Sequence, residues 1–319
     1  MPQPRDVKIV PPDPVINIRN ENQRMLLVVV PCVVLLQLLS LLATQPSCRD
    51  FKLSKVAAFC IVVQWLAFGH ASGMMFGNAP TERFYDLTGS LTFLMSFLWS
   101  GTFVESVDRS LRQRIITICV QIWAVRLGTF LFSRIVKHGG SDSRFTDIKG
   151  NPPRFFIAWT LQGVWCFVTA LPVLILNQAV DSNPLGLVDY LGIAIWALGF
   201  LCEVVADQQK SAFRGEDANR DKFIRHGLWS LSRHPNYFGE ILCWFGIWLS
   251  CTQGMSFFPR LVAFMSPTFV AFLLIRVSGI PLIEKSSDDR WGKMIEYQEY
   301  KLSTPVLIPL VGRRGRAPF

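Results

Sequence analysis

The chain of 319 residues is poor in charge and in histidine, and it lacks any Cys-x-x-Cys pair. Only 17% of its residues are charged, and its four histidines (His70, His138, His226 and His234) lie far apart. Because structural metal sites use closely spaced cysteine and histidine ligands, we expect no metal. The scarcity of charge also excludes an ordinary soluble domain, of which about a quarter is charged.

Half of the residues are hydrophobic, and they form runs near the roughly 20 residues that a membrane-crossing helix needs. We therefore predict an all-α, polytopic membrane protein with seven to eight transmembrane helices. The eight cysteines fall mostly in or beside these runs, where cysteine is a small buried hydrophobe. The candidate spans, the third being the weakest, are 25–45, 56–77, 86–104, 115–133, 155–177, 185–206, 237–257 and 261–283.

The composition divides the chain into three segments. Residues 1–24 are predicted to be a flexible polar arm, residues 25–283 a transmembrane domain, and residues 284–319 a cytosolic tail with one short helix. The first apolar run has no small-residue cleavage pattern, so we interpret it as a retained anchor.

The basic residues, which give a net charge of +9, gather in the loops 134–154 and 207–236, whereas the intervening loop 178–184 has none. The positive-inside rule then places both basic loops and the tail in the cytosol, facing anionic lipid rather than nucleic acid. The basic loops near 49–55 and 109–114 would lie outside, so the side of the N-terminus stays open. We expect an internal membrane such as the endoplasmic reticulum.

Polar residues inside the spans are expensive in a bilayer and need an explanation. Arg126 either extends to the headgroups or serves a function. Gln162 is expected to form a hydrogen bond between helices. Tyr85 and Asp86 open the third span, where Asp86 is a preferred helix cap. The same pair is our candidate for the catalytic proton donor, since a phenol can polarise a ketone.

Four charged residues follow one face at the end of the sixth span. Glu203 and Asp207 are four residues apart, and Lys210 and Arg214 continue the stripe. They predict either a salt-bridge ladder along the helix or a site for a polar cofactor.

The segment 227–240 runs from a basic loop straight into the seventh span. Pro235 can start that helix, and a helix start beside Arg233 and His234 favours phosphate. Simple capping by Ser232 or His234 is the alternative. Glu240 lies one turn inside the membrane, where an unpaired carboxylate is protonated or paired.

With these residues in view, the chain resembles the steroid 5-alpha-reductase-like superfamily, in particular its branch of bacterial and protist homologues. The resemblance covers roughly residues 80–310 and is carried by several motifs. They are Ser232-Arg233-His234-Pro235-Asn236-Tyr237-Phe238-Gly239-Glu240, Arg126-Leu127-Gly128, Asp142-Ser143-Arg144-Phe145, Arg290-Trp291-Gly292 and Tyr297-Gln298-Glu299-Tyr300-Lys301.

The resemblance implies a membrane enzyme that uses NADPH to reduce a carbon–carbon double bond conjugated to a ketone. It carries Asn236 and Glu240 over to the cofactor site, and it matches Asp207 and Arg214. Glu203 stands where the family has asparagine, and a carboxylate cannot donate as an amide does. The substrate is expected to be a sterol, terpenoid or fatty enone. The predicted cofactor-binding residues are Asp207, Lys210, Arg214, Arg225, Ser232, Arg233, His234, Asn236, Tyr237, Glu240 and Tyr300.

Two other functions compete with the reductase. The Arg-His-Pro-x-Tyr helix start and the tail are also similar to isoprenylcysteine carboxyl methyltransferases, which implies S-adenosylmethionine as the alternative cofactor. A transporter or channel would need polar residues along several spans, and they are sparse.

Overall fold

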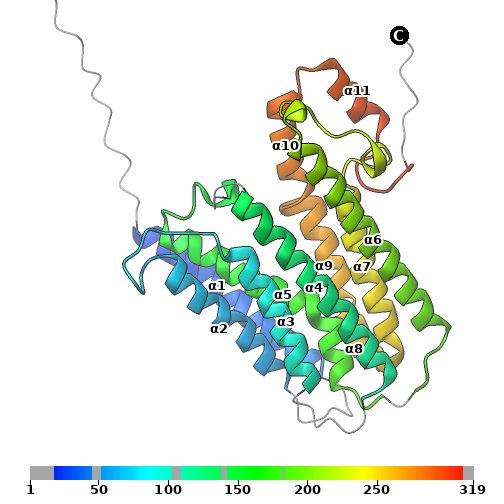
Figure 1. Cartoon of the computed structure of the whole chain (residues 1–319). Coiled ribbons are helices and arrows are strands. Elements are labelled where there is room, and N and C mark those ends of the chain that lie inside the picture. Colours follow the sequence, from blue (N-terminus) through cyan, green and yellow to red (C-terminus); the bar gives the residue numbers. More distant parts are fainter. Residues whose placement is uncertain (1–17, 45–51, 103–108, 138–141, 182, 312–319) are drawn as a thin grey trace, which may run out of the picture.

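The structure, a computed structural model, describes residues 18–44, 52–102, 109–137, 142–181 and 183–311, which form a bundle of helices (Figure 1). The helices over these residues, in chain order, are α1 (Ile18–Leu42), α2 (Leu53–Ala71), α3 (Tyr85–Thr102), α4 (Leu111–Lys137), α5 (Pro152–Gln178), α6 (Leu187–Gly215), α7 (Pro235–Cys251), α8 (Phe257–Ala263), α9 (Met265–Phe272), α10 (Ile280–Trp291) and α11 (Ile295–Ser303).

The structure confirms the predicted fold class, an all-α, multi-pass membrane protein. Within the described ranges, six helical stretches are long and apolar enough to cross a membrane, namely α1, α2, α4, α5, α6 and the run from α8 to α10. The shorter helices α3 and α7, of 18 and 17 residues, complete the bundle by packing along α4 and α6. The third span, expected to be the weakest, thus falls short of the hydropathy of the others.

Several boundaries differ from the predicted ones, and two of these differences have local reasons. Helix α1 begins at Ile18, inside the predicted polar arm, because Glu21 in its first turn pairs with Arg154 at the start of α5 (2.8 Å). The last span is broken after Ala263, since Pro267 cannot donate the hydrogen bond that would continue the helix to Ala263. The rest of the predicted arm, residues 1–17, lies outside the described residues.

Helix α5 is the centre of the bundle, and 89% of its most apolar stretch is buried. Beside it, the aromatic rings of Phe93, Trp123 and Trp244 interlock, with 4.9 Å between the centroids of the two indoles. Gln162 donates from α5 to the Tyr85 carbonyl of α3 (2.8 Å), which confirms its expected role between helices. These contacts make the middle of the bundle a packed aromatic core.

Helices α6 and α7 touch through their backbones. A side chain on Gly239 would place its first carbon 2.6 Å from the Gly199 carbonyl oxygen, and one on Gly246 would lie 2.5 Å from the Gly192 carbonyl oxygen. Such small residues let two membrane helices approach closely. The two glycine pairs therefore set the distance between the polar residues of α6 and those of α7.

One end of the bundle, which we call the capped end, is where α6 ends at Gly215 and α7 begins at Pro235. Helices α10 and α11 fold over this end (Figure 1). The Trp291 indole donates to the Asp221 carbonyl (2.8 Å), which ties α10 to the segment between α6 and α7. The helix start at Pro235 is as predicted, whereas α6 runs nine residues beyond the predicted span 185–206.

The opposite end holds a closed ion cluster around Arg112, whose side chain is 2% exposed. Its guanidinium donates twice to Asp189 (2.6 and 2.9 Å), once to Asp181 (2.6 Å) and once to the Pro184 carbonyl (3.1 Å). The cluster ties the start of α4 to the loop between α5 and α6 and to the start of α6.

Candidate functional site

A layer of four charged side chains and one amide crosses from α4 to α6 and α7 near the capped end. We call Arg126, Glu203, Asp207, Asn236 and Glu240 the ionic layer. The Arg126 guanidinium forms ion pairs with both Glu203 and Asp207. The Asn236 amide donates to the other oxygen of Asp207 (3.1 Å). Arg126, for which the sequence left two roles open, is therefore held inside the protein by two carboxylates.

The ionic layer carries more negative charge than Arg126 can balance. One carboxylate oxygen of Glu203 is buried and has no hydrogen-bond partner in the part of the chain that the structure describes. Glu240 likewise receives no hydrogen bond from any described residue, and the charges that act on it include Glu203, Asp207 and Arg126. Buried carboxylates need donors or protons. Glu203 and Glu240 therefore need a proton or a further donor, and neither is among the residues that line the pocket described next.

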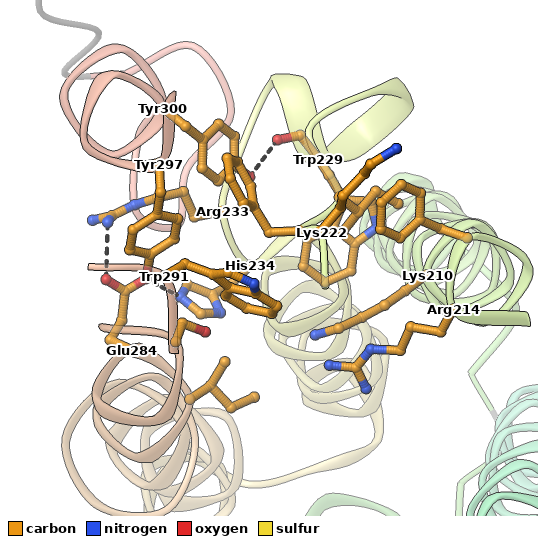
Figure 2. A pocket seen from close by; sticks show the side chains of 15 residues that line it. Lys210, Arg214, Lys222, Trp229, Arg233, His234, Glu284, Trp291, Tyr297 and Tyr300 are labelled. Carbon is orange, nitrogen blue, oxygen red and sulfur yellow. Dashed lines mark hydrogen bonds and ion pairs between the residues drawn. The ribbon is translucent and has the colours of Figure 1, made fainter. Parts of the chain in front are cut away.

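A pocket of about 560 Å³, including its opening to solvent, lies at the capped end (Figure 2). Lys210 and Arg214 of α6 line one side, and Arg233 and His234 line the other together with Glu284 of α10. Because Lys210 follows Asp207 by about one helical turn, the pocket continues from the ionic layer. The rest of its wall comes from Phe213, Lys222, Phe223, Ile224, Trp229, Ile283, Ser287, Trp291, Tyr297 and Tyr300.

The positive charges of the pocket are only partly balanced. Glu284 is its one carboxylate, and it is already paired with Arg233 (2.8 Å), His234 (2.9 Å) and Lys301 (3.4 Å). Lys210 and Arg214 extend side by side in Figure 2, and neither has a carboxylate partner among the residues described. Asp207 offsets the charge of Lys210 in part without forming an ion pair with it. A cluster of cations whose charge is only partly offset attracts an anionic ligand.

Arg134 of α4 adds to this positive field. Arg134, which is also paired with Asp86 (3.7 Å), is close enough to Lys210 and Arg214 to repel their charges. Burial, and then repulsion from Arg214, lowers the pKa of Lys210 to about 7. The Lys210 ammonium also lies 4.5 Å from the centroid of the Trp229 ring, an attractive contact that holds it toward the pocket. Arg134 was missed by sequence reasoning, because its distance from Lys210 depends on how α4 packs against α6.

Aromatic rings form the wall opposite Lys210. The Phe223 ring lies 5.1 Å from that of Tyr297 and 5.4 Å from that of Tyr300, measured between centroids. Burial raises the pKa of Tyr300, so its hydroxyl stays protonated and donates to the Trp229 carbonyl (2.7 Å). Flat apolar walls beside cations suit a ligand that has both a ring system and negative charge.

His234 sits at the start of α7 and stays neutral near pH 7. Burial lowers the pKa of its imidazole, although the hydrogen bond to Glu284 acts in the opposite direction. The side chain does not cap α7, and the neighbouring Ser232 hydroxyl donates to the Leu307 carbonyl of the tail (2.7 Å). Both residues thus hold α7 against α10 and the tail, while the face of His234 stacks on Tyr237 at 5.6 Å.

The remaining predicted residues lie elsewhere. Arg225 is exposed and does not line the pocket. The pocket lining also lacks Asp207, Ser232, Asn236, Tyr237 and Glu240. The Tyr85 hydroxyl donates to the Ala158 carbonyl (2.9 Å), and Asp86 pairs with Arg144 (2.8 Å). The structure therefore brings together the residues predicted on α6 and α7 but gives Tyr85 and Asp86 partners of their own.

Comparisons with known proteins place the chain among relatives without an assigned activity. The model of a family described as "Protein of unknown function (DUF1295)" matches residues 78–304. An uncharacterized protein of Schizosaccharomyces pombe is 24% identical over 184 residues, which are 49% of this chain and 53% of that protein. The chain thus spans about half the length of this relative. No solved structure matches the chain significantly.

Proposed function

We propose a function for this chain, which belongs to the DUF1295 family, from the chemistry of its capped end: reduction of a conjugated carbon–carbon double bond in a lipophilic enone with NADPH. The resemblance of its motifs to the steroid 5-alpha-reductase-like superfamily supports this activity. A sterol, terpenoid or fatty enone fits a protein whose outer surface faces lipid.

The observation that carries the proposal is the uncompensated positive charge of the pocket. A dinucleotide brings phosphates, which guanidinium and ammonium groups bind through charge-assisted hydrogen bonds, and an adenine ring, which can stack on aromatic walls. Lys210 and Arg214 offer the charges, and Phe223 and Trp291 offer the walls. S-adenosylmethionine carries a net positive charge at neutral pH, so the same field disfavours it.

Different residues of the capped end would bind different parts of the cofactor. Lys210 and Arg214 would hold the phosphates. The free oxygens of Glu203 and Glu240 would accept hydrogen bonds from amide or hydroxyl groups of the cofactor, and this assigns Glu203 an accepting role in place of the family's asparagine. NADPH supplies the hydride when bound. The aromatic core beneath the ionic layer excludes water from the reacting end.

Tyr85 and Asp86 are the proposed source of the proton that the reduced carbon skeleton needs. Their side chains are engaged with Ala158 and Arg144, so this role requires them to exchange those partners for the substrate. The capped end, with its basic loops, is proposed to face the cytosol, where NADPH is available. If a glycosylation tag inserted at 216–222 were modified, the capped end would face the lumen and not the cytosol.

The reaction is tested by following deuterium from NADPH labelled at the nicotinamide C4 into a panel of sterol, terpenoid and fatty enones. We expect the label at the β carbon of the saturated ketone. The variants Asn236→Ala and Glu240→Gln should abolish transfer in folded protein, while Glu299→Gln, an exposed carboxylate on α11, should not. If both site variants still transferred deuterium, Asn236 and Glu240 would not belong to the cofactor site.

A methyltransferase is the second candidate, since the sequence Arg233-His234-Pro235 and the tail resemble those enzymes. In that case, S-adenosylmethionine labelled in its methyl group would modify a lipophilic acceptor, and NADPH would not bind.

A further inference from the structure

A second concave site lies between α1 and α2, in the part of the chain that precedes the family match at residue 78. It is a groove of about 420 Å³, including its opening, and it faces the bilayer, because Val62 on its edge is 48% exposed. We propose that this groove binds an uncharged membrane lipid whose single hydroxyl or carbonyl group hydrogen-bonds to Gln37. The proposal does not depend on the reductase activity.

Small and rigid side chains keep the groove open. Ala57 and Ala58 on α2 face Val33 and Leu36 on α1, so the two helices leave space that larger residues would fill. Trp65 closes one end, and its indole donates to Thr160 of α5 (3.0 Å), which fixes the plane of the ring. A flat, fixed ring beside alanines suits a rigid or branched hydrocarbon body.

Gln37 is the one polar side chain in the lining. It is half-buried, and no residue that the structure describes forms a hydrogen bond with its side-chain amide. Three glutamines in other spans are engaged, as Gln64 donates to Thr92 (2.9 Å), Gln113 to the Leu176 carbonyl (2.8 Å) and Gln162 to the Tyr85 carbonyl (2.8 Å), whereas Gln121 on α4 resembles Gln37 in lacking a partner among the described residues. An amide left unpaired in hydrocarbon destabilises the protein. An occupant that pairs with Gln37 would remove that cost.

The depth of Gln37 restricts the occupant. It precedes the end of α1 at Leu42 by about 8 Å at 1.5 Å per residue, so it lies below the headgroup level. A charged phospholipid headgroup is too costly at that depth, whereas a hydroxyl or carbonyl group is tolerated. Residues 1–17 precede the other end of α1 and carry Arg5, Asp6, Lys8 and Asp13, so they do not suit an apolar groove.

The test is photolabelling of the full chain in phosphatidylcholine vesicles with a diazirine sterol that has a free hydroxyl. The same sterol as a methyl ether and a diazirine phosphatidylcholine serve as comparison probes. We expect the free sterol to label peptides of α1 and α2 most strongly. Gln37→Leu should reduce this labelling about tenfold, and Ala58→Phe should abolish it by filling the groove. Val34→Phe, on the lipid-exposed side of α1, should leave it unchanged.

Equal labelling by phosphatidylcholine, or labelling that Gln37→Leu does not reduce, would show ordinary lipid contact and overturn the proposal. Cross-linked dimers through α1 in place of labelling would assign the groove to a second copy and overturn it as well. A circular dichroism spectrum matching that of the unmodified protein is required of each variant, and Gln37→Asn, which keeps an amide, should retain part of the labelling.

Discussion

The two ends of the bundle both hold arginine–carboxylate clusters, yet they differ in how completely these are paired. At the opposite end, Arg112 uses its donors on Asp181, Asp189 and a backbone carbonyl, and it is sealed from solvent. At the capped end, Lys210 and Arg214 have no carboxylate partner among the described residues. The first cluster is complete without a ligand, and the second is not.

We interpret this difference as one of role: the charges around Arg112 stabilise the fold, and those of Lys210 and Arg214 bind a ligand. Cations that gather in an open pocket without carboxylate partners attract an anionic ligand, whereas the Arg112 charges already neutralise one another. Substitutions at the two ends should therefore have opposite signatures. At the closed cluster they should lower stability and spare binding, and at the open pocket they should spare or raise stability and lower binding.

The largest effect is expected for Arg112→Leu. It leaves Asp181 and Asp189 buried without a counter-charge, which should cost about 3–5 kcal/mol and lower the melting temperature strongly. Thermal unfolding in detergent measures this loss. NADPH affinity of the folded fraction should be unchanged. A melting temperature equal to that of the unmodified protein would mean that the closed cluster does not stabilise the fold.

The next effect tests the contact between α6 and α7. In Gly239→Ala, the added carbon would lie 2.6 Å from the Gly199 carbonyl oxygen, so the helices must separate. We expect a loss of about 1–3 kcal/mol from overpacking and weaker NADPH binding, because Asn236 moves away from Asp207. Gly215→Ala is the matched control, since nothing lies within 4 Å of its added carbon. Equal behaviour of the two variants would argue against a close-packed interface.

The open pocket is probed by Lys210→Met, which keeps the length of the side chain and removes its charge. The melting temperature without ligand should rise slightly, because the repulsion from Arg134 and Arg214 disappears. Affinity for NADPH, measured by titration calorimetry, should fall about tenfold or more through the lost phosphate contact. A variant that is both less stable and unchanged in affinity would assign Lys210 to the fold instead.

The smallest effect concerns His234. Burial lowers the pKa of its imidazole, so the unfolded chain binds a proton at a higher pH than the folded protein does. Stability from this residue is therefore full above the ordinary histidine pKa and is lost as the pH falls, by at most about 1.4 kcal/mol per pH unit. The melting temperature should drop between pH 7 and pH 5, and less so in His234→Gln. An equal drop in both proteins would exclude His234 as the source.

Hydropathy and helix-terminus signals predicted most of the spans and the start of α7 at Pro235, since these depend on neighbouring residues. The stripe from Asp207 to Arg214 was also visible, because it follows helical spacing. The sequence did not reveal which charged residues of different helices pair with one another. Arg126 reaches Glu203 across 77 positions, and Arg233 reaches Glu284 across 51, and such pairs depend on helix packing.

Two features of the sequence could have improved the prediction of the site. Gly192 and Gly199 have the same spacing as Gly239 and Gly246, a pattern that indicates close contact between two helices. Arg126, as a deep arginine, called for a carboxylate, and Glu203 and Asp207 were the nearest candidates in a span. Neither signal identifies the ligand. The balance of charge in the pocket depends on how Glu284 of α10 packs against Arg233 and His234.

The central claim is that the capped end binds an anionic dinucleotide, and the most direct measurement is the thermal shift of the purified protein with NADPH or with S-adenosylmethionine. The account predicts that NADPH raises the melting temperature, that this rise shrinks in Lys210→Met, and that S-adenosylmethionine has no effect. Stabilisation by S-adenosylmethionine alone would contradict it.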